Sequence, residues 1–189
     1  MLRDLVADID CRHRLRWPQR PVTALSRLCL LARSPGLWTL ALHRLSHCWR
    51  ERTAARLLLA PLKWLMMVLT KCDIGSSACM EPGVCLSDQG HIIFGAAHTG
   101  HGTIVGTRVT VGRRLVDAAH PTIGRNVRIG NDCVVYGPIH VGDGATLLAG
   151  TVLSKSVPPG AVVEGNPARL IRKGHFPTPD ETVTPHVPA

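Results

Sequence analysis

Residues 123–157 read IGRNVRIGNDCVVYGPIHVGDGATLLAGTVLSKSV, and in this stretch an aliphatic side chain returns every six residues. A small or β-branched side chain follows four residues after each of them. Six matches neither the helical period of about 3.6 nor the strand period of about two. It is typical of a solenoid in which three short strands close one triangular coil. The aliphatic positions are Ile123, Ile129, Val135, Val141, Leu147 and Leu153.

The same spacing extends upstream less regularly. Residues 112–122 interrupt it, and we interpret them as a loop that leaves the solenoid. The sequence predicts a mainly β protein with a solenoid over residues 73–173, about five and a half coils of ~18 residues, in which residues 168–173 leave the last coil. Residues 174–189 are rich in proline and are predicted to form a flexible tail. The upstream positions are Ile74, Met80, Leu86 and Ile92, then, after a slip of one residue, Ile93, Thr99, Val105 and Val111.

Residues 1–72 have a different character, because they carry the whole net charge of +9 and all four tryptophans. Apolar residues at helical spacing predict a basic α-helical region. No apolar run reaches the roughly 20 residues of a membrane span. Two interpretations stay open: the helices pack on the first coil and on sister subunits, or a basic helix makes peripheral contact with an anionic membrane. No motif accompanies the charge, so we predict no nucleic-acid binding.

The compartment is predicted from the cysteines and the N-terminus. The seven cysteines are odd in number and never spaced CxxC, which disfavours a disulfide framework and a zinc knuckle. Buried reduced thiols are typical of a cytosolic protein. The first residues contain two acids and no apolar signal core. We therefore expect a cytoplasmic protein.

Several motifs resemble those of bacterial serine acetyltransferases, which belong to the left-handed β-helix acyltransferases. They are the hexapeptide run, VTVG at 109–112, His120-Pro121 before Ile123-Gly124, and VPPGAVVEGNPARLI at 157–171. The resemblance implies a left-handed β-helix and a homotrimer with its site at the subunit interface. It also implies transfer of an acetyl group from acetyl-CoA to the hydroxyl of a small acceptor, with no metal.

The resemblance also implies catalytic positions. Where the family has a catalytic Asp-His pair, this sequence has Ser87 and Asp88, and the family's second histidine is His120. The arginine that would precede it to bind the serine carboxylate is Ala119, which argues against serine as the acceptor. We predict His120 and Asp88 as catalytic residues and Ser87 as substrate-binding. Two further cations of the same loop, Arg113 and Arg114, are predicted to bind the acceptor.

Three histidines lie close together in the sequence near the lost catalytic histidine. His98 and His101 are candidates for a relocated base, and His91 is a candidate for contact with the substrate. Exposed histidines without a role are the simpler interpretation. A zinc site is the sharper alternative, but the stretch offers no fourth ligand, so we predict no metal.

For the acyl donor, the positions that match the family's CoA site are Gly112, Asn131 and Ala149, with Lys155 and Arg169 as partners for phosphates. The sequence therefore predicts an acetyl-CoA-dependent O-acetyltransferase. Two alternatives stay open: an O-acetyltransferase of sugars or polysaccharide precursors, and a non-catalytic solenoid that binds CoA or scaffolds partners.

Overall fold

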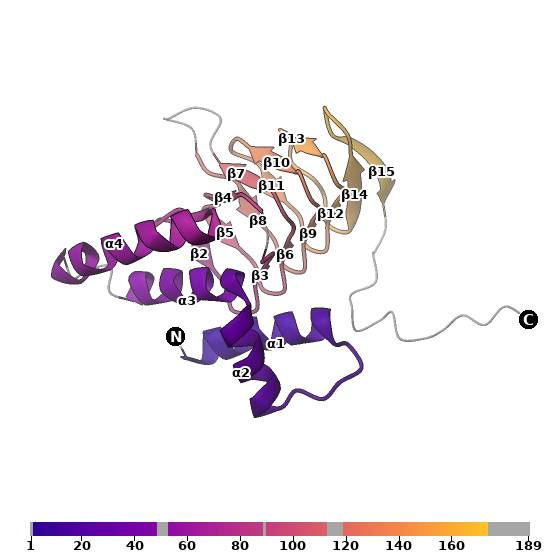
Figure 1. Ribbon diagram of the computed structural model, residues 1–189. Coiled ribbons are helices and arrows are strands. Elements are labelled where there is room, and N and C mark those ends of the chain that lie inside the picture. The colour runs from indigo at the N-terminus through magenta and orange to yellow at the C-terminus, as the bar shows by residue number, and fades with distance from the viewer. Residues whose placement is uncertain (1, 49–52, 89, 113–118, 174–189) are drawn as a thin grey trace, which may run out of the picture.

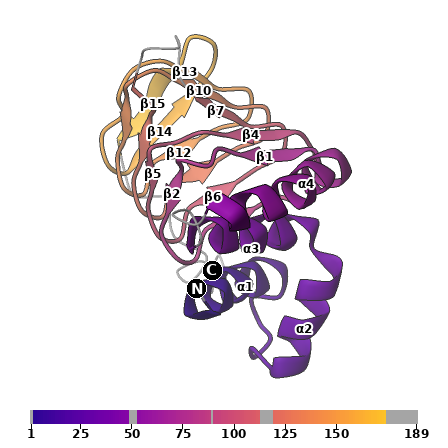
Figure 2. The same ribbon diagram turned by 90° about the vertical axis from the view of Figure 1, so that its left-hand side faces the viewer.

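A computed structural model describes residues 2–48, 53–88, 90–112 and 119–173. Within these residues, four helices precede fifteen short strands, so the predicted helical front end and mainly β fold are confirmed. Figures 1 and 2 show the helices gathered at the β1–β3 end of the solenoid. The helices are α1 (Leu2–Arg16), α2 (Ala24–Arg33), α3 (Pro35–Cys48) and α4 (Thr53–Thr70).

The strands form a three-sided parallel solenoid. One sheet has the order β1-β4-β7-β10-β13, the second β11-β8-β5-β2, and the third β15-β14-β12-β9-β6-β3. The strands are β1 (Cys72–Ile74), β2 (Cys79–Met80), β3 (Cys85–Leu86), β4 (Ile92–Phe94), β5 (His98–Thr99), β6 (Ile104–Val105), β7 (Thr110–Gly112), β8 (Thr122–Ile123), β9 (Arg128–Ile129), β10 (Val134–Tyr136), β11 (His140–Val141), β12 (Thr146–Leu147), β13 (Val152–Leu153), β14 (Ala161–Glu164) and β15 (Arg169–Lys173).

The interior of the solenoid is filled by the side chains that set the six-residue period. All six aliphatic positions between Ile123 and Leu153 are buried, none more than 3% exposed. The smaller residues that follow them, such as Val127 and Ala145, are fully buried. Burial of these side chains along one continuous core stabilises the stack of coils.

Three details differ from the sequence prediction. Ile93 is 42% exposed, whereas Ile92 and Phe94 are buried, so the predicted inward position is wrong by one residue. The described residues form four complete turns, followed by β13 and β14 of an irregular fifth, because β8 follows β7 within one turn and β15 adds no coil. Residues 169–173 do not leave the last coil, since β15 folds back antiparallel on β14.

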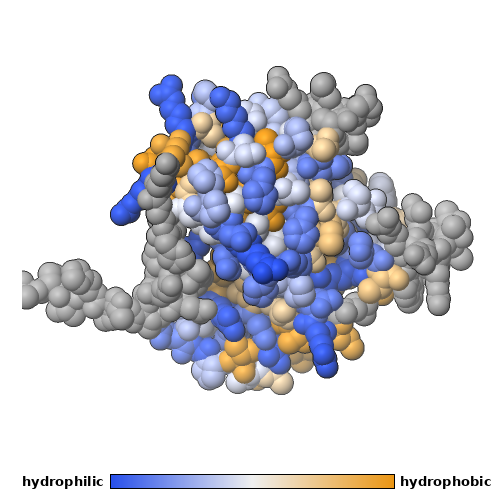
Figure 3. Space-filling view, turned by 180° about the vertical axis from the view of Figure 1, so that it is seen from behind, coloured by the Kyte–Doolittle hydropathy of each residue, from blue (hydrophilic) through white to orange (hydrophobic). Residues whose placement is uncertain are grey.

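The helices cover the first coil. α1 and α3 pack on β3, and α3 and α4 pack on β1. Large apolar side chains remain exposed on α2 and α4, including Leu25 at 77% and Trp64 at 64%. The view from behind in Figure 3 shows hydrophobic residues at the surface of the lower, helical end. Within the described residues, no helix is long and apolar enough to cross a membrane.

Candidate active site

Two edges of the prism carry most of the predicted site residues. We call the edge at which the chain leaves β3, β6, β9 and β12 the β3 edge, and the edge at which it leaves β4, β7, β10 and β13 the β7 edge. Leu86, Ile129 and Leu147 hold the same position in their strands, linked through Val105 in a continuous register. The residues two positions later, Asp88, Asn131 and Ala149, therefore follow one another along the β3 edge. Neighbouring strands lie about 4.8 Å apart, so β3 and β9, two coils apart, are separated by about 10 Å.

Asp88 is held by the helical region. Its Oδ1 accepts a hydrogen bond from the Gly36 amide, at the start of α3, over 3.3 Å. Its Oδ2 forms an ion pair with Arg12 of α1, and Arg12 also donates to the Leu86 carbonyl over 2.5 Å. The Asp88 side chain is 32% exposed. Both carboxylate oxygens thus have a donor, which favours an orienting or binding role over that of a free base.

His120 is oriented differently. It lies before β8 on the β7 edge, and its Nδ1 is hydrogen-bonded to the Gly95 carbonyl. A carbonyl only accepts, so Nδ1 carries the proton. In the neutral imidazole the lone pair then lies on Nε2, the tautomer that a general base requires. His120 is half-buried rather than fully exposed.

Two members of the histidine cluster, His98 and His101, lie on other parts of the solenoid. His98 is exposed on β5, 3.4 Å from Glu81 Oε1, and the exposed His101 donates from Nδ1 to the Pro82 carbonyl over 2.5 Å. The His101 amide and Arg125 hold the pKa of Glu81 below its ordinary value. His91 is exposed directly before β4, in the same corner as Ser87 and Asp88, so it belongs to the β3 edge. Among the described residues, no group of three or more His, Cys, Asp and Glu side chains is arranged to hold a metal ion.

The residues predicted to bind CoA fall in three places. Asn131 and Ala149 are exposed on the β3 edge, where the Asn131 side chain also accepts the Thr107 amide over 2.9 Å. Gly112 ends β7 and the exposed Lys155 follows β13, so both belong to the β7 edge. Arg169 lies on β15, opposite Glu164 of β14. One chain therefore does not bring these positions together.

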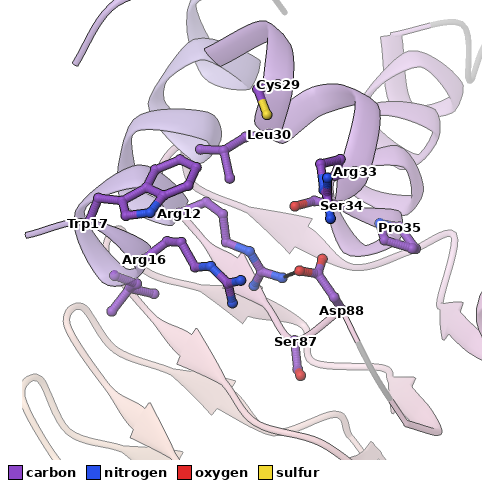
Figure 4. A pocket seen from close by; sticks show the side chains of 11 residues that line it. Arg12, Arg16, Trp17, Cys29, Leu30, Arg33, Ser34, Pro35, Ser87 and Asp88 are labelled. Carbon is purple, nitrogen blue, oxygen red and sulfur yellow. Dashed lines mark ion pairs between the residues drawn. The ribbon is translucent and has the colours of Figure 1, made fainter. Parts of the chain in front are cut away.

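Two predicted residues, Arg113 and Arg114, lie outside the described residues. Ser87 follows β3 and lines a cavity of about 850 Å³ together with Asp88 (Figure 4). The other walls of this cavity come from α1, α2 and the start of α3. Sequence reasoning missed their contribution, although the last turn of α1 is visibly basic. The missed lining residues include Arg12, Arg16, Trp17, Leu30 and Arg33.

Comparison with known sequences shows a likeness to hexapeptide-repeat proteins. The family model described as bacterial transferase hexapeptide (six repeats) matches residues 120–155. A serine acetyltransferase of Mycobacterium tuberculosis is 34% identical over 144 residues, which cover 72% of this chain and 61% of that protein. Serine acetyltransferase 2 of Arabidopsis thaliana is 30% identical over 177 residues, covering 91% and 54%. The chain thus spans between about half and three fifths of these relatives.

Solved structures give the same match in three dimensions. The serine acetyltransferase of Brucella abortus strain S19 superposes with a TM-score of 0.76 at 26% identity, covering 92% of this chain and 69% of that one. The structure of that acetyltransferase in complex with coenzyme A gives a TM-score of 0.78 at 25% identity, covering 91% and 68%. The likeness includes the helical region as well as the solenoid, since it covers nine tenths of the chain.

Proposed function

We propose that the chain is a serine acetyltransferase-like member of the left-handed β-helix acyltransferases and that it transfers an acetyl group from acetyl-CoA to the hydroxyl of a small acceptor. The observation that carries this proposal is His120. Its Nδ1–H is fixed on the Gly95 carbonyl, which leaves Nε2 to take a proton. We propose the cytoplasm as the location, where acetyl-CoA is available and the seven free cysteines stay reduced.

The chemistry assigned to the chain is general base catalysis. Nε2 of His120 takes the proton of the acceptor hydroxyl while the oxygen attacks the thioester carbonyl. The tetrahedral intermediate then expels the thiolate of CoA, which receives the proton. Backbone N–H groups in the glycine-rich coils are suited to stabilise the oxyanion. Asp88 orients the site from the β3 edge.

The residues of the β7 edge are compatible with an acyl donor. Apart from Gly112 itself and its chain neighbours, no heavy atom of the described residues lies within 4 Å of the place that a Cβ on Gly112 would occupy, so the backbone is open to a ligand there. Lys155 offers an exposed cation two residues after β13 for a phosphate group. These features support a role of Gly112 and Lys155 in binding acetyl-CoA.

The distribution of the site supports a homotrimer. The predicted residues lie on two different edges of one prism, and three prisms around a threefold axis place one edge of each beside another edge of its neighbour. We propose that Asp88 and Asn131 of one subunit face His120 of the next. Light scattering on the purified protein should give three chains per particle, and a monomeric particle with full activity would contradict the shared site.

The exposed apolar side chains of α2 and α4 form a surface suited to contact with another molecule. We propose that this surface packs against sister subunits, with peripheral contact to an anionic membrane as the alternative. Flotation with anionic liposomes separates the two. Protein that stays in the soluble fraction supports subunit packing, and protein that floats supports the membrane.

The test of the activity is the release of free thiol from acetyl-CoA. Serine, homoserine, neutral sugars, sugar phosphates and amines should be compared at equal concentration. Turnover with a hydroxyl compound supports the proposal. A sugar as the best acceptor is favoured by the volume of the cavity beside Ser87, about 850 Å³. Retained CoA binding without turnover of any acceptor would instead identify a non-catalytic solenoid.

A further inference from the structure

The cavity between the helices and the β3 edge is unusually basic. Three of its lining residues are arginines, and Asp88 is the only acid among them. Arg12 and Arg16 come from α1, and Arg33 comes from the end of α2. In Figure 4 the side chains of Arg12 and Arg16 both extend from α1 toward the side where Asp88 lies, and Arg33 enters from the other helix. Arginines from two helices thus line one cavity.

The charges in this cavity do not cancel. Arg12 is neutralised, because it is paired with Asp88 and donates to the Leu86 carbonyl. Across the part of the chain that the structure describes, Arg16 and Arg33 make no ion pair or side-chain hydrogen bond. Both residues are exposed, and both line the cavity. Two positive charges are therefore available to a ligand.

The remaining walls indicate the size and nature of that ligand. Trp17 and Leu30 supply apolar surface, and Ser34 and Ser87 supply hydroxyl groups. A volume of about 850 Å³ lies in the range of small-molecule sites, which run from about 300 to 1,000 Å³. The guanidinium group of arginine matches the oxygens of a carboxylate or phosphate with two parallel hydrogen bonds. The cavity therefore suits an anion larger than a single amino acid.

We propose that this cavity binds the acceptor, and that Arg16 and Arg33 hold an anionic group, a carboxylate or a phosphate, on a hydroxyl compound. This inference rests on the proposed function, since it names the class of acceptor. The cavity opens beside Ser87 and Asp88, which puts a bound acceptor at the β3 edge. The N-terminal helices thereby supply the cationic clamp that the uncharged Ala119 does not.

Binding should be measured without acetyl-CoA, so that the result does not depend on catalysis. Glucose, glucose 6-phosphate and glucuronate form a matched set of one neutral and two anionic sugars for titration calorimetry at fixed ionic strength. We expect the anionic sugars to bind at least tenfold more tightly than glucose. Which of the two binds better tells phosphate from carboxylate. Raising the salt concentration should weaken binding, because both arginines are exposed.

Variants locate the binding to the cavity. Arg16→Gln and Arg33→Gln should each weaken binding of the better anion by about tenfold or more, because each removes a charged hydrogen bond donor. Arg20→Gln, an exposed arginine that does not line the cavity, should leave binding unchanged. Neither Arg16 nor Arg33 has a described partner, so these variants should melt at the wild-type temperature.

Three results would overturn the inference. They are equal binding of glucose and its anionic derivatives, unchanged affinity in the double variant Arg16→Gln/Arg33→Gln, and displacement of the bound sugar by CoA. The last would assign the cavity to the acyl donor. Anion binding that depends on both arginines in a protein that never releases CoA would contradict only the proposed activity. Turnover of the anionic acceptor at wild-type rates by both variants would contradict only the anion clamp.

Discussion

Asp8 of α1 and Arg44 of α3 form a buried, two-pronged ion pair, with Nε to Oδ2 at 2.6 Å and Nη2 to Oδ1 at 2.9 Å. Asp8 also accepts hydrogen bonds from the amides of Gly83 and Val84, over 2.7 and 3.1 Å. Arg44 donates in addition to the carbonyls of Met80 and Glu81. One ion pair therefore joins two helices to the turn between β2 and β3.

Replacing Asp8 by alanine should lower the free energy of unfolding by about 3–5 kcal/mol, because the Arg44 charge is left buried without its partner. The matched control is Asp10→Ala on the same helix, which removes a partly exposed pair with Arg27. That change should cost at most about 1 kcal/mol. Urea denaturation measures both. Similar losses for the two variants would show that the Asp8–Arg44 pair is no stronger than a surface pair.

The stability should also depend on His43. Its Nε2 donates to the Ala78 carbonyl over 3.1 Å, its Nδ1 has no partner among the described residues, and burial lowers its pKa to about 4. The folded state therefore binds a proton less readily than the unfolded state. Stability from this group is complete above pH 6.5 and falls as the pH drops from 6.5 toward 4, by about 1.4 kcal/mol per unit.

The change that tests this is His43→Leu, which should flatten the difference in urea midpoint between pH 7.5 and pH 5. His91→Leu, an exposed histidine directly before β4, serves as the control and should keep the wild-type pH dependence. If the midpoint of the His43 variant still falls as steeply with acid, another group is responsible.

The inward side chains of β4 predict a contrast between neighbours. Phe94 is completely buried, in register with Ile74 and Val111, whereas Ile93 is 42% exposed. Phe94→Ala should cost about 3–5 kcal/mol, because it leaves a cavity in the solenoid. Ile93→Ala should cost less than about 1 kcal/mol. Thermal unfolding of the two variants checks this, and a reversed order would contradict the register.

His120 predicts a kinetic effect. His120→Ala should lower kcat by about a hundredfold or more, because the base is lost, while the KM for acetyl-CoA changes little. His140→Ala on exposed β11 is the control and should keep the wild-type rate. Thiol release under saturating substrates measures both. An unchanged rate in the His120 variant would move the role of base to Asp88 or to the cluster of His91, His98 and His101.

The solenoid was predictable from the sequence because aliphatic side chains enter its interior at a fixed interval of six residues. The prediction failed at Ile93 because Ile92, Ile93 and Phe94 are all large and apolar, so composition does not tell the inward face from the outward one. The ladder settles it, since Phe94 pairs with Ile74 twenty residues earlier. The inward residues Leu86 and Phe94 are eight positions apart instead of six, so the corner after β3 is two residues longer than in the regular repeat. The sequence spacing alone does not reveal this insertion.

The cavity beside Asp88 was harder to predict. Arg12 and Gly36 lie 76 and 52 residues before the aspartate that they contact. No local pattern reports a contact of that range, and it exists only once α1 and α3 have docked on β3. The sequence showed that the last turn of α1 is basic, but it did not show which part of the molecule this charge faces. Only the structure therefore shows that Arg16 and Arg33 line the cavity.

β15 runs antiparallel to β14, whereas each earlier pairing in the solenoid is parallel. A further coil cannot pair in parallel with the reversed strand β15 at this end of the solenoid. At the other end, helices cover the first coil. Exposed strand edges invite fibre growth, and a reversed strand blocks that growth on the sheet it covers. The helices at one end and β15 at the other thus limit the number of coils, because the hexapeptide repeat itself sets no limit.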